Sequence, residues 1–162
     1  MTYLLGAKSL ANLAGVDPAL VAVAKLAITL TGQDFGFTTP QVRTVAQEEV
    51  LIAQGASHCL HSHHIPGPEG DGPIGRGGAC DAVPWTGSAF VWEWPRIFVI
   101  ARAFKGAAAR LNTGITWGGV WDKLMSQYDD PAAEESAYVG RRQAGGYPRV
   151  FVDGPHFELG RN

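Results

Sequence analysis

Two residues near the C-terminus, Asp153 and His156, lie three positions apart beside a Gly-Pro turn. The apolar residues on either side predict strands, so the segment 151–159 could present a metal ligand and a general base from one rigid support. An Asp-x-x-His pair is common by chance and indicates little alone. It becomes informative because the chain also contains His64 followed by a downstream aspartate, and Arg43 near the start of a predicted helix.

These residue types match the needs of a catalytic zinc site, which takes three protein ligands and leaves the fourth position to water. His64, one aspartate and His156 supply such a set. Zinc lowers the pKa of its water to about 7, and Asp153 is the carboxylate expected to accept the proton and return it to the leaving amine. We expect Arg43 to hold a substrate carboxylate or to polarise the scissile carbonyl. The pattern predicts a small zinc peptidase.

Capping and turn signals predict the helices that must position these residues. A short helix is expected over 9–14, and an Asp-Pro signal starts a second one over 17–32. A Thr-Pro signal predicts a third helix over 39–55, with Arg43 in its first turn. The clearest apolar stripe, over 95–111, predicts a core helix without chemistry.

Strands and loops account for the remainder. Strands are expected within 78–85 and at 115–117, the latter followed by a tight Gly-Gly turn. Residues 66–78 are rich in Gly and Pro and predict an ordered loop. Between 122 and 150 the pattern fades, with one or two helical turns expected at 132–139. This stretch is either a lid over the site or a surface loop, and we favour the loop.

Four histidines, His58, His61, His63 and His64, occur within eight residues of one another. Imidazole is the commonest metal ligand, but four histidines cannot all bind one peptidase zinc. We therefore expect most of them to be surface residues of a loop.

The bulk composition indicates one globular catalytic domain over residues 1–162. Hydrophobic content is 46%, and the net charge of -2 gives no electrostatic case for nucleic acid or an anionic membrane as partner. The two cysteines, Cys59 and Cys80, do not suggest a disulfide framework. The first residues lack the pattern of a signal peptide, so we expect synthesis in the cytoplasm with no export route of its own.

Several motifs, taken together, carry a family resemblance over most of the chain. They are Ser-x-His at 62–64, Trp-x-Trp-Pro at 92–95, Trp-Gly-Gly-x-Trp at 117–121 and Asp-Gly-Pro-His-Phe at 153–157. The chain thereby resembles the LAS-type zinc peptidases, and among them the phage endolysins that act as L-alanyl-D-glutamate endopeptidases on peptidoglycan. The resemblance implies an α+β fold of the hedgehog and D,D-peptidase type, in which a small antiparallel sheet carries the zinc and helices pack against it.

Carried over to this sequence, the resemblance implies zinc bound by His64, an aspartate and His156. Asp153 corresponds to the catalytic carboxylate of the family, and Arg43 to its substrate-contacting arginine. No separate cell-wall-binding domain is visible in the sequence.

The ligand aspartate has two candidates. The usual family spacing gives Asp71, whereas the local family context of Ala-x-Asp before a proline and an aromatic residue gives Asp81. We prefer Asp81, because Asp71 lies between glycines while Asp81 lies on a predicted strand that can hold a ligand still. Residues 68–77 are then an insertion near the cleft. The histidine His63 stands where the family usually has a basic residue and is a rival ligand.

Further residues have both a structural and a functional interpretation. Trp117 and Trp121 are expected in the core, but near a cleft they could also pack on peptide or sugar. Glu158 alternates with His156 on a predicted strand, so it either orients that ligand or faces solvent. Cys80 is expected as a small buried residue rather than a ligand.

Three functions are compatible with these residues. The first is an endopeptidase that cuts the L-Ala–D-Glu bond of peptidoglycan, the second a D,D-carboxypeptidase or dipeptidase at D-Ala-D-Ala termini, and the third a non-catalytic zinc-binding module. Asp153 argues against the third, and the motifs at 117–121 and 153–157 favour the first. A monomeric lytic enzyme made in the host cytoplasm would need a holin-type partner that permeabilises the membrane before it reaches the periplasm and cell wall.

Overall fold

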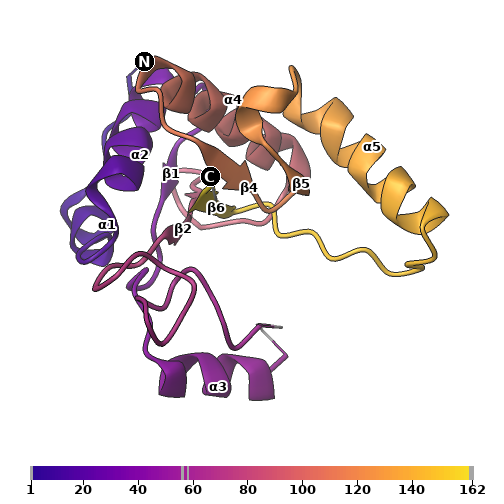
Figure 1. Cartoon of the computed structure of the whole chain (residues 1–162). Coiled ribbons are helices and arrows are strands. Elements are labelled where there is room, and N and C mark those ends of the chain that lie inside the picture. The colour runs from indigo at the N-terminus through magenta and orange to yellow at the C-terminus, as the bar shows by residue number, and fades with distance from the viewer. Residues whose placement is uncertain (1, 56, 58, 161–162) are drawn as a thin grey trace.

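The structure is a computed structural model, which describes residues 2–55, 57 and 59–160. Its helices and strands follow one another in a mixed order that gives an α+β architecture (Figure 1). The helices are α1 (Ala7–Asn12), α2 (Pro18–Leu30), α3 (Val45–Ala53), α4 (Trp94–Arg110) and α5 (Pro131–Ala144), with a short 3-10 helix at Met125–Gln127. The strands are β1 (Phe35–Gly36), β2 (Ala79–Asp81), β3 (Val83–Pro84), β4 (Ile115–Trp117), β5 (Val120–Leu124) and β6 (His156–Leu159).

Four of these strands form the antiparallel sheet on which the fold is built, in the order β2-β6-β4-β5. β1 and β3 form a separate antiparallel pair. The last strand in the sequence, β6, therefore lies inside the sheet, where it is hydrogen-bonded to β2 on one side and β4 on the other. This placement confirms the expected fold class of a small antiparallel sheet with packed helices.

One face of the sheet packs against α4, and α4 in turn packs against α2. The rings of Phe104 on α4 and Phe157 on β6 are stacked with centroids 3.8 Å apart, and both side chains are fully buried. Burying a side chain of this size stabilises a fold by ~1.5–3 kcal/mol. Because neighbouring residues of a strand point to opposite faces, the burial of Phe157 directs His156 and Glu158 to the other face.

The helix α3 begins later than the sequence signals predict. Residues 39–44 are not helical, and the helix starts after a capping box in which Thr44 and Gln47 bond each other's backbone N–H groups. The Thr-Pro signal fails because the segment before the helix is tied elsewhere: Gln41 N–H donates to Asn12 O, and Arg43 N–H donates to His64 O. Arg43 therefore precedes the helix, and its predicted place in the first turn is wrong.

The segment 122–150, predicted as a surface loop with one or two helical turns, contains a long regular helix. α5 has 14 residues, with Pro131 in its first turn and Tyr138 buried at 5% exposure. It packs against β5 and α4 and projects from the sheet on the right of Figure 1, while α3 lies below the sheet. The residues before the turn at 154–155, predicted as a strand, have no regular structure.

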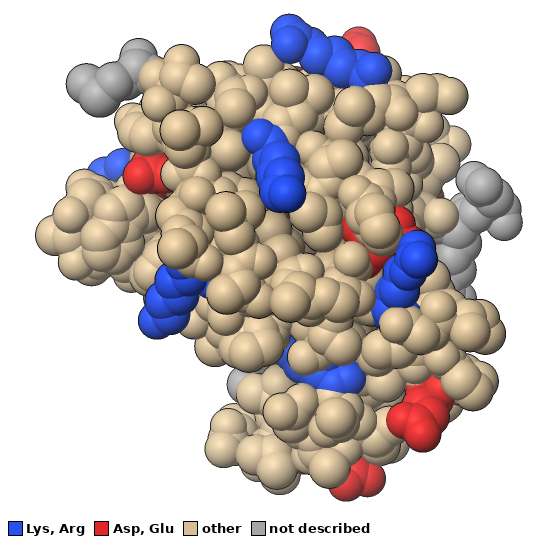
Figure 2. Space-filling model, turned by 90° about the vertical axis from the view of Figure 1, so that its left-hand side faces the viewer, with Lys and Arg blue, Asp and Glu red and all other residues tan. Residues whose placement is uncertain are grey.

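The surface on the α1 and α2 side is largely uncharged. Figure 2 shows Lys and Arg side chains on this face that are separated from one another by other residues. In the part of the chain that the structure describes, no helix is both long enough and apolar enough to cross a membrane.

Candidate metal centre and its cleft

Three side chains from distant parts of the sequence converge on the open face of the sheet. Asp81 ends β2 and His156 begins β6, and the two residues are directly paired across these strands. His64 comes from the loop that precedes residues 66–78. Asp81 Oδ1 lies 3.3 Å from His64 Nε2 and 3.1 Å from His156 Nδ1, and the two nitrogens are 3.3 Å apart.

This triangle fits a zinc ion. Bonds of ~2.0–2.1 Å to a tetrahedral zinc place neighbouring ligand atoms about 3.3–3.4 Å apart. The three observed separations are 3.1 to 3.3 Å. Two imidazole nitrogens and one carboxylate oxygen are also a donor set that zinc accepts, with a fourth position left open for water. The residues present therefore match the metal that the sequence implies.

The outer nitrogen of each histidine has an acceptor that fixes the ring. His64 Nδ1 lies 2.7 Å from the carbonyl oxygen of Gln41, and His156 Nε2 lies 3.0 Å from Glu158 Oε2. A carbonyl or carboxylate oxygen can only accept, so each of these nitrogens carries the hydrogen. The nitrogen that points into the triangle is then the one able to bind a metal, as is usual for metal-ligating histidines.

The electrostatic interactions within the triangle shift the pKa values of Asp81 and His156 in favour of their charged forms. Burial opposes ionisation of Asp81, but electrostatic attraction to His64 and hydrogen bonds from His156 and His64 hold the pKa of its carboxyl well below the usual range. Burial alone would lower the pKa of His156, but its hydrogen bonds to Asp81 and Glu158 raise it to about 10. Without a metal, His156 is therefore an imidazolium that bridges two carboxylates.

Arg43 lines the cleft, and both of its terminal nitrogens contact protein carboxylates. Nη2 donates to Asp81 Oδ2 at 2.8 Å, and Nη1 donates to Glu48 Oε2 at 3.2 Å. Glu48 is completely buried and also accepts a hydrogen bond from Ser57. The arginine thus holds the outer oxygen of Asp81, which leaves Oδ1 directed at the two histidines.

Asp153 lines the same cleft, in the segment before β6. Its backbone N–H donates to Gly118 O at 2.8 Å, and Gly118 N–H donates to His156 O at 2.8 Å. A side chain at Gly118 would collide with the Asp153 carbonyl, so a glycine is required for this close approach. Burial raises the pKa of Asp153 and repulsion from Asp81 raises it further, although His156, His64 and Arg43 counteract the shift.

The triangle lies in a cleft of about 720 Å³. Asp71 also lines this cleft, but Asp81 is the aspartate grouped with His64 and His156. His63 is buried and also lines the cleft, with Nε2 3.7 Å from Glu158 Oε1, but it is not one of the three grouped donors.

The expectation of surface histidines holds for only part of the cluster. His61 is exposed, whereas His63 and His64 are buried at 8% and 2% exposure. His58 lies outside the described residues.

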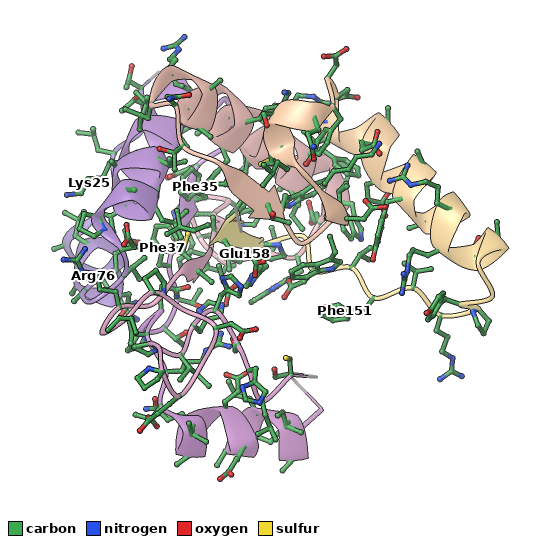
Figure 3. All side chains as sticks on the ribbon, in the orientation of Figure 1. Lys25, Phe35, Phe37, Arg76, Phe151 and Glu158 are labelled. Atoms are coloured by element: carbon green, nitrogen blue, oxygen red, sulfur yellow. The ribbon has the colours of Figure 1, made fainter. Side chains whose placement is uncertain are left out.

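The two tryptophans of the Trp-Gly-Gly-x-Trp motif have different environments. Trp117 is fully buried, and its indole N–H donates to Gly154 O at 2.6 Å, so the expected substrate contact by Trp117 is not supported. Trp121 lines the cleft, stacks on Phe151 with centroids 5.7 Å apart and lies 5.1 Å from the His156 ring. Figure 3 shows Phe151 on the chain segment that leads into β6 and Glu158 at the sheet.

Sequence reasoning missed several residues that support the site. Gln41 is 1% exposed and bonds Asp81 N–H through its side chain while its carbonyl orients His64. Glu48 is the buried partner of Arg43. No local signal marks Gln41, but an acid one helical turn after the Arg43-Thr44 pair could have drawn attention to Glu48.

Comparison with known proteins gives consistent results. A family model described as phage L-alanyl-D-glutamate peptidase matches residues 1–160. The L-alanyl-D-glutamate peptidase of Escherichia phage T5 is 28% identical over 134 residues, which span 80% of this chain and 90% of that protein. The crystal structure of the Serratia marcescens L-Ala D-Glu endopeptidase ChiX is similar with a TM-score of 0.66 and 27% identity, over 98% of this chain and 91% of that one.

Proposed function

The chain belongs to the phage L-alanyl-D-glutamate peptidase family, and from this premise we propose that it hydrolyses the L-Ala–D-Glu bond of peptidoglycan with a zinc ion held by His64, Asp81 and His156. One observation carries the proposal above all. The family match extends over residues 1–160, so it includes the two histidines and the aspartate whose donor atoms lie 3.1 to 3.3 Å apart. Peptide hydrolysis at a three-ligand zinc site is an established combination.

The reaction adds water across one amide bond. The water oxygen bonds to the carbonyl carbon of L-Ala, the C–N bond to D-Glu breaks, and the products are an L-Ala carboxylate and a D-Glu amine. When bound, zinc would polarise the carbonyl and lower the pKa of water from ~15.7 to about 7.

Asp153 is the proposed general base. A carboxylate oxygen of Asp153 accepts the proton from the attacking water and later donates it to the departing nitrogen. Its burial and its proximity to Asp81 raise its pKa, which makes the protonated form easier to reach and so suits the second step. The hydrogen bonds of Asp153 and His156 to Gly118 hold the base and the ligand at a fixed separation.

Arg43 is proposed to act mainly through Asp81. Its contact at Asp81 Oδ2 orients the carboxylate so that one oxygen faces the two histidines. The positive charge of Arg43 also lies at the cleft, where it favours a carbonyl oxygen that becomes negative during attack. Trp121 is proposed as the apolar wall against which the substrate peptide lies.

In its cellular role we propose a monomeric endolysin whose catalytic domain spans residues 1–162. Such an enzyme is made in the host cytoplasm and acts on the cell wall after a holin-type protein has permeabilised the membrane. The family match and the phage relative support the endolysin part of this proposal.

The test is digestion of purified peptidoglycan followed by mass spectrometry of the fragments. A new D-Glu N-terminus is expected, whereas release of D-Ala would instead indicate a D,D-carboxypeptidase. Treatment with EDTA should abolish the digestion and added zinc should restore it. Digestion that continues after complete metal removal would refute the zinc proposal.

A further inference from the structure

The proposed substrate carries a second carboxyl group, on its glutamate residue, that the metal centre does not bind. Glutamate has two carboxyl groups, and at most one of them continues the peptide chain. The other, close to the scissile bond, is either a free carboxylate or an amide. An enzyme that acts at this bond can therefore distinguish the acid from the amide. A preference of this chain for one of the two rests on the proposed function.

A free carboxylate would enter a cleft that is already rich in negative groups. The acidic residues that line it are Glu48, Asp71, Asp81, Asp122, Asp153 and Glu158. Among the described lining residues, the cations from lysine and arginine are Arg43 and Lys123. Binding of a substrate carboxylate here needs a positive partner, because like charges at close range repel one another strongly.

Arg43 is not free to serve as that partner. It is paired with Asp81 at 2.8 Å and with Glu48 at 3.2 Å. Glu48 is completely buried, so a movement of Arg43 toward the substrate would leave a charge in the interior without its ion-pair partner, which is costly.

Lys123 is paired in a way that lets it change partner. Its side chain is 35% exposed, and Nζ lies 2.7 Å from Glu134 Oε1 on α5. Glu134 has a second cation, Arg141, at 2.9 Å, and Arg141 also contacts Asp122. Glu134 therefore remains paired with Arg141 if Lys123 turns to a substrate carboxylate, which replaces the ion pair that Lys123 gives up.

The position of Lys123 relative to the metal centre suits a group next to the scissile bond. Trp121 and Lys123 both lie on β5 and both line the cleft. The Trp121 ring lies 5.1 Å from the ring of His156. Lys123 thus lines the same cleft as the three side chains of the metal centre.

We propose that Lys123 binds the free carboxylate of the glutamate residue at the scissile bond and makes the enzyme prefer the acid over the amide. Lys123 is then a specificity-determining residue. Glu134 and Arg141 of α5 keep the ammonium group of Lys123 at the wall of the cleft.

The test uses two synthetic stem peptides that differ only in this group, one with the free carboxylate and one with the amide. For the unaltered zinc-loaded enzyme, kcat/KM should be about tenfold higher on the acid, since a hydrogen bond between charged groups is of that strength. In Lys123→Met the ratio of kcat/KM on the acid to kcat/KM on the amide should fall to one or below, through a raised KM on the acid. Lys123→Arg, which keeps the charge, should restore most of the preference.

Lys25→Met is the matched control, because Lys25 is an exposed lysine of α2 that Figure 3 shows on the far side of the molecule from Phe151. It should keep the preference of the unaltered enzyme, with the same zinc content. A preference that persists in Lys123→Met, or its absence in the unaltered enzyme, would overturn the role of Lys123. Failure of the unaltered enzyme to cut either peptide would instead overturn the proposed function.

Discussion

Asp81 and His156 are direct partners across the antiparallel strands β2 and β6, and Asp81 Oδ1 lies 3.1 Å from His156 Nδ1. This pairing brings together two residues that are 75 positions apart in the sequence. The sheet register therefore determines two of the three donors, and the loop that carries His64 closes the triangle. Four measurements follow from this arrangement, and a fifth tests it directly.

The first concerns the ligand aspartate. Asp81→Ala should lower zinc affinity by more than the about 10–100-fold typical of losing an outer partner of a metal ligand, because it removes one donor of the triangle. Asp71→Ala is the matched control, since Asp71 lines the cleft outside the triangle. Zinc affinity measured by competition with a chelator checks both. The opposite outcome, with affinity lost only in Asp71→Ala, would move the ligand to Asp71.

The second concerns the general base. Asp153→Asn keeps the size of the side chain and the backbone bonds to Gly118, so zinc content should be unchanged. Turnover should fall about 10²–10⁴-fold, the usual contribution of a positioned acid–base group. Steady-state hydrolysis of a stem peptide and metal analysis of the same sample provide the measurement. A near-normal rate would exclude Asp153 as the base.

The third concerns pH. His156 has its pKa raised to about 10 in the metal-free protein, so it is protonated at pH 8. Zinc needs the lone pair on Nδ1, and its binding at pH 8 should therefore release about one proton from His156. Calorimetric titrations in two buffers of different ionisation enthalpy measure this number. Release of no proton would mean that His156 is neutral before the metal binds.

The same shift has a consequence for the stability of the metal-free protein. A raised folded-state pKa means that the charged His156 stabilises the fold fully below its unfolded value of 6.5. This stabilisation is lost as the pH rises toward about 10. The metal-free protein should thus lose stability over this alkaline range, whereas the zinc-loaded protein should be less sensitive to it.

The fourth concerns Glu158, which accepts from His156 Nε2 at 3.0 Å. Glu158→Ala removes the acceptor that fixes the ring, so zinc affinity should fall about 10–100-fold. Glu49→Ala, an exposed acid on α3, serves as control and should have no effect. An unchanged zinc affinity in Glu158→Ala would show that the ring of His156 is oriented by other contacts.

Local sequence signals predicted much of the fold and the chemical types at the site. The Asp-Pro cap predicts α2, the apolar stripe predicts α4, and the Gly-Gly turn after Trp117 correctly separates β4 from β5. His64, Asp81 and His156 were predicted from residue type, spacing and resemblance, and the structure brings them together.

What the sequence could not predict depends on contacts between distant residues. The Thr-Pro signal before α3 fails because Gln41 and Arg43 bond to carbonyls of Asn12 and His64, which no local pattern reveals. α5 was underestimated because it packs against β5 and α4, where Glu134 pairs with Lys123, and these contacts join segments that are distant in the sequence. The same contacts place Lys123 at the cleft, so its role is visible only in three dimensions.

The central claim is that one zinc ion is bound between His64, Asp81 and His156. An anomalous difference map collected at the zinc absorption edge from crystals of the zinc-loaded protein tests it most directly. We predict a single strong peak at ~2.0–2.2 Å from His64 Nε2, Asp81 Oδ1 and His156 Nδ1. A peak bound by other residues, or no peak within bonding distance of these three atoms, would contradict the account.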